Sequence, residues 1–189
     1  MSSDGLKKAI FLDRDGTINE EREYLFRAED MEFIPGAVDA MALLKSAGFV
    51  LVVVTNQSGI GRGFYSETDL LQLHDFMQNE LKKSFASVDA FYFCPHHPVH
   101  GKGDYLQDCS CRKPLPGMIL QAATDLGIDL ASSWMIGDKQ ADVEAGFTAG
   151  CRPILVRTGY GAVDSGSISS QIPVVDDLLA AARLILTQS

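Results

Sequence analysis

Two acidic residues crowd into one short turn of the stretch FLDRDGTINEE, residues 11–21. Asp13 and Asp15 follow an apolar run and are separated only by Arg14. Carboxylates this close repel each other unless they share a cation or a proton. One carboxylate can attack phosphorus to form an aspartyl-phosphate, and a second can protonate the leaving oxygen and later activate water. The pair therefore indicates a metal site, a reaction, or both.

Residues with complementary chemistry lie in three other stretches of the chain. Thr55 offers a hydroxyl, and the backbone amides after it can bind phosphate oxygens. Lys113, in the stretch RKP, offers a fixed positive charge, and Asp138, in GDKQAD, offers a further acid that can hold Mg²⁺ together with Asp13. Magnesium takes oxygen ligands and few protein carboxylates. Phosphate-ester hydrolysis is among the slowest uncatalysed reactions, so a nucleophile and charge neutralisation are both needed.

Asp142 follows Asp138 in the same motif, and its type allows two interpretations. It can support Asp138 or Lys139 from behind the site. It can instead cap the helix expected over residues 141–149. The residues alone leave both open.

A segment rich in Cys and His carries a second set of candidate ligands. Cys94, His96, Cys109 and Cys111 form two close pairs in a C-x-H…C-x-C pattern. Thiolates and imidazoles spaced this way suit tetrahedral zinc, and four protein ligands leave no open position, so the zinc would be structural. It would order the loop over residues 94–111.

Alternatives to this zinc site remain. His97 or His100 can replace His96 as the ligand, and the cysteines can be ordinary cytosolic thiols. Cys151 stands alone at the start of an expected strand, where a buried cysteine behaves as a small apolar residue.

Strand-like and helix-like segments alternate along the chain and must position these side chains. β-branched, continuous apolar runs predict strands, and apolar residues at helical spacing predict helices. We expect strands over residues 9–12, 49–55, 90–93, 134–136, 153–156 and, at an edge, 174–175. We expect helices over residues 38–47, 66–83, 117–126, 141–149 and 177–186, and loops over 94–116 and 161–171.

This alternation predicts the α/β class, with a Rossmann-like parallel sheet and helices on both faces. Ligands of such sheets bind beyond the carboxyl ends of the strands. Asp13, Thr55, Cys94 and Asp138 each come just after a predicted strand, so four segments should converge on one edge. The length of 189 residues fits a single domain over residues 1–189.

Composition and charge narrow the class of partner. The net charge is −9, from 25 acidic and 16 basic residues, which argues against nucleic-acid binding because that needs a basic surface. The apolar runs are too short to span a bilayer, and the apolar run near the N-terminus is too short for a secretory signal. We expect a cytoplasmic monomer, without membrane association, that acts on a small molecule.

Four stretches, DRDGT, VTNQS, RKP and GDKQAD, resemble in content and order the motifs of haloacid dehalogenase-like (HAD-like) phosphatases. The resemblance extends from Ala9 to about Val156 and implies the HAD-like fold. Dehalogenases of this superfamily lack an acid two residues after the nucleophile, so Asp15 favours a phosphatase. The intervals between the first motifs leave no room for a large cap domain. The expected zinc loop would place Arg112 and Lys113 over the phosphate site.

Within the superfamily, FLDRDGTIN, VVVTNQSGIGRG, CPHHP, CSCRKPLPGM and GDKQAD resemble the D-glycero-D-manno-heptose-1,7-bisphosphate 7-phosphatases. This resemblance implies Mg²⁺-dependent removal of the 7-phosphate, in the synthesis of nucleotide-activated heptose for the lipopolysaccharide core. It implies that Asp13 is the nucleophile and Asp15 the acid/base, and that Thr55 and Lys113 bind the phosphoryl group. The implied Mg²⁺ ligands are Asp13, Asp15 through its backbone, and Asp138. The implied substrate-binding residues are Glu21, Arg22, Glu23, Tyr24, Thr55, Asn56, Gln57, Ser58, Arg112, Lys113 and Lys139.

Other functions share part of this pattern. Histidinol-phosphate phosphatases have similar aspartate motifs and a similar zinc loop, and are the main alternative. Repair of nucleic-acid 3′-phosphate ends fits the acidic composition poorly. A zinc-stabilised binding module without activity is disfavoured because Asp13, Asp15, Lys113 and Asp138 are all present. The heptose family usually has Gly at the position of Glu23, and the preferred anomer is not readable from the residues.

Overall fold

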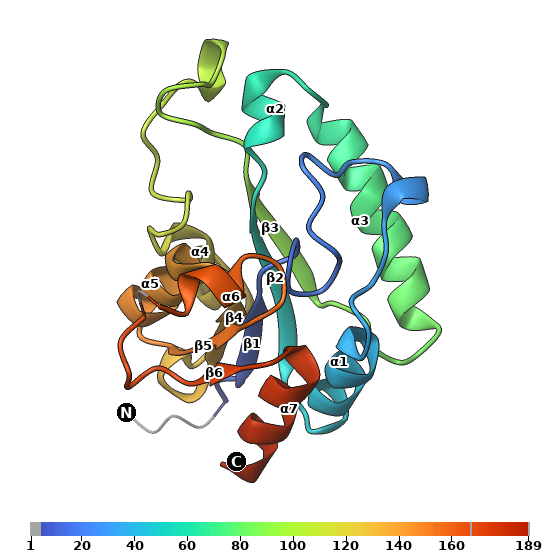
Figure 1. Cartoon of the computed structure of the whole chain (residues 1–189), viewed down its shortest axis with the longest axis vertical. Coiled ribbons are helices and arrows are strands. Elements are labelled where there is room, and N and C mark those ends of the chain that lie inside the picture. The colour runs from blue at the N-terminus through green and yellow to red at the C-terminus, as the bar shows by residue number, and fades with distance from the viewer. Residues whose placement is uncertain (1–4, 167, 189) are drawn as a thin grey trace.

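The computed structural model of the chain describes residues 5–166 and 168–188. A six-stranded parallel sheet forms its centre, with the strands in the order β3-β2-β1-β4-β5-β6 (Figure 1). The strands are β1 (Ala9–Leu12), β2 (Val50–Asn56), β3 (Ala90–Cys94), β4 (Trp134–Gly137), β5 (Arg152–Val156) and β6 (Val174–Val175). The α-helices are α1 (Ala37–Ser46), α2 (Ser58–Arg62), α3 (Glu67–Lys82), α4 (Gly117–Leu126), α5 (Gln140–Ala149), α6 (Gly161–Asp164) and α7 (Leu178–Thr187).

The central strand β1 lies where the strand order reverses, between β2 and β4. Its last residue, Leu12, pairs with Val53 on one side and Ile136 on the other. The carboxyl ends of these three strands therefore lie side by side. In open parallel sheets, this reversal point is where ligands bind.

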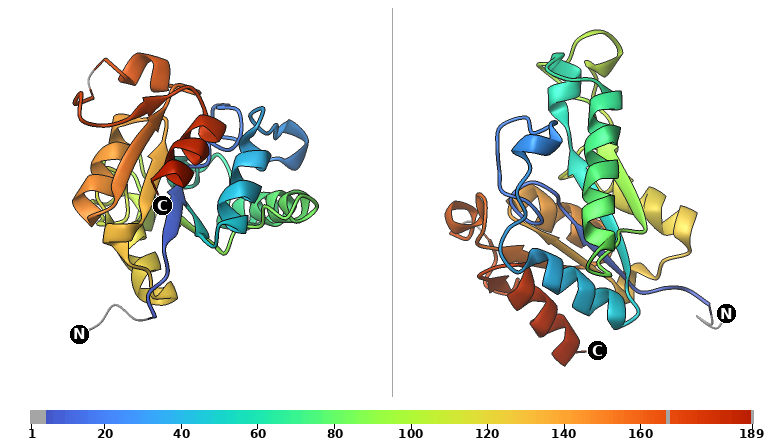
Figure 2. Two further views of the ribbon diagram at one scale, coloured as in Figure 1. Left: turned by 90° about the horizontal axis from the view of Figure 1, so that it is seen from below. Right: turned by 90° about the vertical axis from the view of Figure 1, so that its right-hand side faces the viewer.

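The sheet is buried on both faces, which explains why its strands are almost entirely apolar. Ile10 and Leu12 of β1 pack into a core layer formed with α1, α3 and α7. Phe11, which points to the opposite face, packs with residues of α4 and α5. Figure 2 shows these two helix layers on either side of the sheet.

The predicted elements agree with the structure to within a few residues at each boundary. The helix expected from residue 66 is α3, with Ser66 as its N-cap and a reciprocal hydrogen bond from Ser66 N to the Asp69 carboxylate. Short 3₁₀ turns lie over Ala28–Asp30, Gly103–Tyr105 and Leu130–Ser132. No helix in the part of the chain that the structure describes is long and apolar enough to span a membrane.

Two short helices were not predicted. The expectation of loop structure throughout residues 161–171 is wrong, because α6 occupies Gly161–Asp164. The Asp164 carboxylate accepts a hydrogen bond from Gln140 N at the start of α5, which ties the short helix to this earlier helix. Helix α2 contains Gly59 and Gly61, which disfavour a helix. A Cβ at position 59 would clash with the Tyr65 ring, so the close packing of this ring explains why the helix has glycine there.

Candidate active site

A buried row of alternating charges lies at the carboxyl ends of β1 and β2. Lys113 Nζ lies 2.8 Å from Asp13 Oδ1 and 2.6 Å from Asp142 Oδ1. It also donates to the Val54 carbonyl at 2.7 Å. All three ammonium hydrogens are thus used. A phosphoryl group would therefore meet Lys113 as a fixed positive charge more than as a free donor.

The pKa of Lys113 reflects this arrangement. Burial lowers the pKa of the ammonium, but the Asp13 and Asp142 carboxylates outweigh burial and raise it above its usual value. Lys113 therefore stays charged at neutral pH.

Asp142 caps the helix, as one of the two interpretations allowed, and its other contact is with Lys113, which neither interpretation named. One carboxylate oxygen contacts Lys113, and the other accepts a hydrogen bond of 3.0 Å from Lys139 N at the first turn of α5. Both oxygens are therefore engaged with protein groups. Asp142 caps the helix and holds Lys113 in place.

Asp138 lies fully buried at the end of β4, enclosed by backbone from two other segments. Its Oδ2 accepts from Tyr160 N at 2.8 Å, whereas its Oδ1 has no partner among the described residues. Gly16 and Gly159, both with positive φ, approach so closely that a Cβ on either would clash with the Asp138 carboxylate. This approach explains the glycine after the two opening acids.

The acids at this edge fit a cation. Oxygens of Asp13, Asp138 and Asp142 lie within 4.8 Å of one another. Burial, followed by repulsion from Asp142 and Asp15, raises the pKa of Asp13 to about 6, although Lys113 opposes the rise. Burial and repulsion from Asp13 and Asp142 raise the pKa of Asp138 to about 8. A divalent cation would relieve this repulsion and occupy the unpartnered oxygen of Asp138.

Asp15, partly exposed, is held by three neighbouring side chains. Arg14, which is fully buried, donates through Nε and Nη2 to the carboxylate at 2.9–3.1 Å. Asn19 Nδ2 donates to Oδ1 at 2.9 Å, and Gln57 Nε2 donates to Oδ2 at 3.1 Å. The positive charge between the two opening acids therefore pairs with the second of them.

Two residues at the end of β2 shape this part of the site in different ways. Thr55 Oγ1 accepts a hydrogen bond of 2.8 Å from Gln57, which leaves the Thr55 hydroxyl hydrogen available to a ligand. The Asn56 side chain exchanges two 3.0 Å hydrogen bonds with the backbone of Lys113. Asn56 therefore fixes the segment that carries Lys113.

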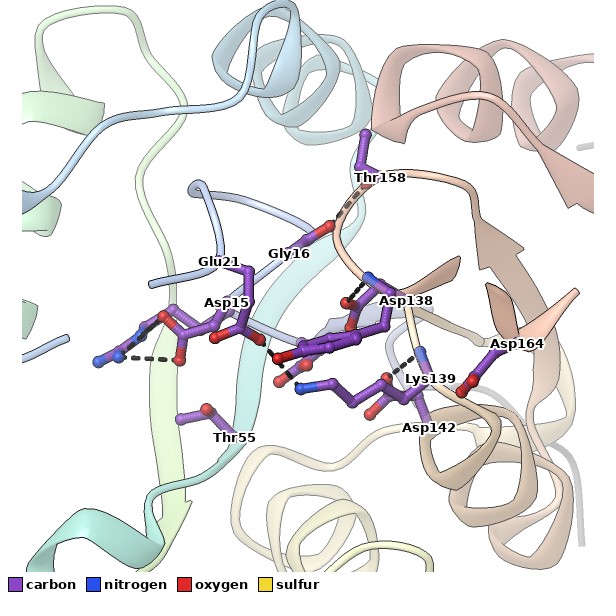
Figure 3. Close-up of polar contacts among 12 residues, drawn as sticks. Asp15, Gly16, Glu21, Thr55, Asp138, Lys139, Asp142, Thr158 and Asp164 are labelled. Carbon is purple, nitrogen blue, oxygen red and sulfur yellow. Dashed lines mark hydrogen bonds and ion pairs between the residues drawn. The ribbon is translucent and has the colours of Figure 1, made fainter. Parts of the chain in front are cut away.

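A cleft of about 370 Å³ lies beyond the sheet edge, and its lining includes Asp13, Asp15, Thr55, Asn56, Lys113 and Asp142. Figure 3 shows Asp15 and Thr55 lying near Asp138, Lys139 and Asp142, so that three segments of the chain converge. Every residue predicted to bind substrate lines this cleft: Glu21, Arg22, Glu23, Tyr24, Thr55, Asn56, Gln57, Ser58, Arg112, Lys113 and Lys139. The sequence did not identify Leu25, Gly59, Tyr65, Ala141 and Tyr160, which also line it.

An ion pair crosses the cleft between the loop after β1 and the loop after β4. Lys139 Nζ lies 3.0 Å from Glu21 Oε2 and 4.5 Å from the centre of the Tyr160 ring. Burial lowers the pKa of Lys139, but Asp138 and Glu21 outweigh it and raise the pKa above its usual value. Burial also raises the pKa of Glu21, against the opposing effect of Lys139.

The loop around position 23 accommodates a glutamate where the heptose family usually has glycine. Tyr24 has a φ of 56°, whereas Glu23 is not among the described residues with positive φ. A glycine is therefore not required by the backbone at position 23. The Tyr24 ring packs edge-on against Phe64, with ring centres 4.6 Å apart.

The four predicted zinc ligands form one cluster. The Sγ atoms of Cys94, Cys109 and Cys111 lie 3.1–3.5 Å from one another. His96 Nδ1 lies 3.3 Å from Cys111 Sγ and 3.7 Å from Cys94 Sγ. These four atoms surround one point, as tetrahedral zinc requires.

The other histidines of this loop lie outside the cluster. His97 Nδ1 accepts hydrogen bonds from the backbone of Val99 and His100, so it shapes the loop. His96 belongs to the cluster, and its backbone carbonyl accepts a 3.2 Å hydrogen bond from Arg112 Nη1. Arg112 lines the cleft, so this hydrogen bond connects the cluster to the cleft.

Sequence reasoning missed the residues behind Asp15. Arg14 stood out only as a charge between two acids, and nothing in its type predicted full burial. Tyr65, which donates to Gln57, lies in the segment between two helices, and no role was predicted for it from the sequence. Tyr160 follows β5 and contributes a backbone amide as well as its ring, and a backbone contact leaves no signal in side-chain type.

The chain is similar to characterised families over most of its length. Residues 110–181 match the family model described as "HAD-hyrolase-like". The chain is 48% identical over 162 residues to a D-glycero-β-D-manno-heptose-1,7-bisphosphate 7-phosphatase of Pasteurella multocida, covering 85% of this chain and 88% of the relative. It is 49% identical over 152 residues to the Escherichia coli K12 protein of that name, covering 80% of each.

A solved structure agrees with these relatives. The D,D-heptose 1,7-bisphosphate phosphatase from B. bronchiseptica, complexed with magnesium and phosphate, superposes with a TM-score of 0.87 and 36% identity. The match covers 96% of this chain and 99% of that one. The sequence similarity, the fold and the converging acids agree, and the chain belongs to the D-glycero-β-D-manno-heptose-1,7-bisphosphate 7-phosphatase family of HAD-like hydrolases.

Proposed function

We propose that the protein is a Mg²⁺-dependent phosphatase that removes the 7-phosphate of D-glycero-D-manno-heptose 1,7-bisphosphate. The observation that carries this proposal is the convergence of Asp13, Asp15 and Lys113 in one cleft, with the buried Asp138 carboxylate beside Asp13. The names of the curated relatives support the sugar and favour its β anomer at carbon 1.

In the first step, a carboxylate oxygen of Asp13 attacks phosphorus. A bond forms from Asp13 to phosphorus, and the bond from phosphorus to the sugar oxygen at carbon 7 breaks. Asp15, in its protonated form, gives its proton to that oxygen, so the sugar leaves as a neutral alcohol. Lys113 stabilises negative charge near Asp13 throughout, and the Thr55 hydroxyl donates to a phosphoryl oxygen.

In the second step, water hydrolyses the aspartyl-phosphate on Asp13. Asp15, now ionised, takes a proton from the water as the water oxygen bonds to phosphorus. The bond from phosphorus to Asp13 breaks, which releases inorganic phosphate and regenerates the carboxylate. Asp15 ends protonated, as it began, so one residue serves as acid and then as base.

Asp13 and Asp138, with the backbone carbonyl of Asp15, would hold Mg²⁺. Bound Mg²⁺ supplies charge neutralisation to the phosphoryl oxygens and to the carboxylates around it. Cys94, His96, Cys109 and Cys111 would hold structural Zn²⁺, which orders the loop that carries Arg112.

A second phosphate on the substrate suits the remaining charges of the cleft. Arg112, Lys139 and Arg22 line it in addition to the buried Lys113, whose ammonium is engaged with Asp13 and Asp142. Arginine binds phosphate in a bidentate manner. We infer that Arg112 contacts the retained 1-phosphate and that Glu21, paired with Lys139, accepts hydrogen bonds from sugar hydroxyls.

The test is phosphate release with Mg²⁺ from both anomers of the heptose 1,7-bisphosphate and from histidinol phosphate. We expect kcat/KM to be highest for the β-heptose bisphosphate. A preference for histidinol phosphate would refute the substrate but retain the chemistry. Absence of release from all three would refute the proposed function.

A further inference from the structure

A buried tyrosine stands behind the candidate acid/base. Tyr65 lies between α2 and α3 with 7% of its surface exposed. Its hydroxyl donates to Gln57 Oε1 at 2.5 Å, and Gln57 Nε2 donates to Asp15 Oδ2 at 3.1 Å. A continuous hydrogen-bonded path therefore runs from Tyr65 to the Asp15 carboxylate.

The Gln57 carboxamide has one orientation that satisfies its neighbours. Ionised Asp15 only accepts hydrogen bonds, so it must face the NH₂ group. The Arg14 guanidinium only donates, and its Nη2 lies 3.4 Å from Oε1. The second hydrogen of the NH₂ group goes to Thr55 Oγ1 at 2.8 Å. Since the contact with Arg14 is long, Tyr65 makes the shortest hydrogen bond to the Gln57 carbonyl.

Tyr65 is itself held rigidly. Its ring stacks on Phe26, with centres 5.2 Å apart and an interplanar angle of 12°. A Cβ at Gly59 would clash with the Tyr65 ring, so the glycine leaves the space that the ring fills. Burial raises the pKa of the Tyr65 hydroxyl above its usual value, so it remains a donor at neutral pH.

Asp15 needs such support because an acid/base must lie within hydrogen-bond reach of the oxygen it serves. A displacement of about 1 Å at a reacting group can lower a rate by about 100-fold. Arg14 and Asn19 contact Oδ1, and Arg14 also contacts Oδ2. Gln57 is the remaining described side chain that donates to Oδ2, so its position helps set the rotation of the carboxylate.

We propose that Tyr65 is a positioning residue for Asp15 and acts through the Gln57 carboxamide. This inference rests on the proposed function, in which Asp15 protonates the leaving oxygen. A residue that only fills the core would act through its ring. Tyr65, by this inference, acts on the position of Asp15 through its hydroxyl.

The experiment compares wild type, Tyr65→Phe, Gln57→Ala and the double variant on the heptose bisphosphate. Tyr65→Phe retains the stacking on Phe26 and removes the donor. We expect its kcat to fall about tenfold, less than the contribution of roughly 100-fold or more that the acid/base group itself makes, with KM within about twofold. If Tyr65 acts through Gln57, then Tyr65→Phe causes little further loss in the Gln57→Ala background.

The leaving group gives a second readout. p-Nitrophenolate leaves without a proton, so kcat/KM of Tyr65→Phe for p-nitrophenyl phosphate should fall much less than for the sugar phosphate. Tyr92→Phe is the matched control, because it removes a 2.8 Å tyrosine hydrogen bond to Asp125 outside the cleft. It should leave kcat unchanged.

The outcomes separate the two proposals. Suppose that the wild type is active. Either an unchanged kcat in Tyr65→Phe or additive losses in the double variant would then overturn the role of Tyr65 and leave the proposed function intact. A wild type without phosphatase activity would overturn the proposed function and, with it, this inference.

Discussion

Lys113 Nζ lies 2.8 Å from Asp13 Oδ1, with 3% of the lysine side chain and 8% of the aspartate side chain exposed. The pair places a fixed cation against the carboxylate that we expect to attack phosphorus. Asp142, on the other side of Lys113, completes a buried group with one positive and two negative charges. Its excess negative charge is what a bound cation would balance.

Replacing Lys113 by methionine should therefore destabilise the protein and abolish activity. Asp13 and Asp142 would remain buried without their counter-ion, at a cost of roughly 3–5 kcal/mol in the free energy of unfolding. Urea denaturation in the absence of Mg²⁺ measures this cost.

The double variant Lys113→Met, Asp142→Asn provides the control for that experiment. It removes one unpaired charge, while the side-chain oxygen of the introduced asparagine can still cap α5. We expect part of the stability to return but no activity. Full activity in either variant would contradict a catalytic contribution from the Lys113 charge.

Removing zinc should disorder the loop and weaken substrate binding. Cys109→Ser removes one ligand of the cluster, so zinc content should fall from about one ion per chain and the thermal midpoint should drop. Arg112, which contacts the His96 carbonyl, should lose its fixed position, which raises KM.

Cys151→Ser is the matched control, because Cys151 is a buried thiol outside the cluster. It should retain zinc, measured by metal analysis, even if the substitution lowers stability. Full zinc occupancy in Cys109→Ser would refute the predicted ligand set.

His74 should make stability dependent on pH below neutrality. Burial, with repulsion from Arg14, lowers its pKa to about 3, against an ordinary value of 6.5. Between these two values the unfolded chain binds a proton that the folded chain excludes. The free energy of unfolding should therefore fall as pH drops from 6.5, with a slope approaching about 1.4 kcal/mol per pH unit.

His74→Gln tests this slope by comparison. Glutamine can still accept a hydrogen bond from Arg14, which lies 3.5 Å from His74 Nε2, but it does not titrate. Stability measured from pH 7 to pH 5 should fall less steeply in the variant. Parallel curves would show that His74 does not couple folding to protonation.

Much of the fold could be predicted because its strands are apolar runs between helical patterns. The ends of β1, β2 and β4 carry the chemistry, so the order of elements was enough to bring Asp13, Thr55 and Asp138 together. The zinc cluster was also predictable, because its ligands occur in close sequence pairs.

The remaining features depend on contacts that have no local signature. Helix α2 forms in a glycine-containing segment because that segment packs against Tyr65 and the zinc loop. The positions of Arg14, Tyr65 and His74 depend on a buried network between segments far apart in sequence. Such residues lack a spacing pattern that sequence reasoning could use.

The most direct test of the central claim is rapid acid quenching during turnover of substrate labelled with ³²P at the 7-phosphate. The mechanism predicts protein-bound label on the peptide that contains Asp13, labile to hydroxylamine as an acyl phosphate is. Asp13→Asn, folded and with full zinc content, should show neither label nor turnover. Full turnover by that variant, or label that maps to another residue, would contradict the account.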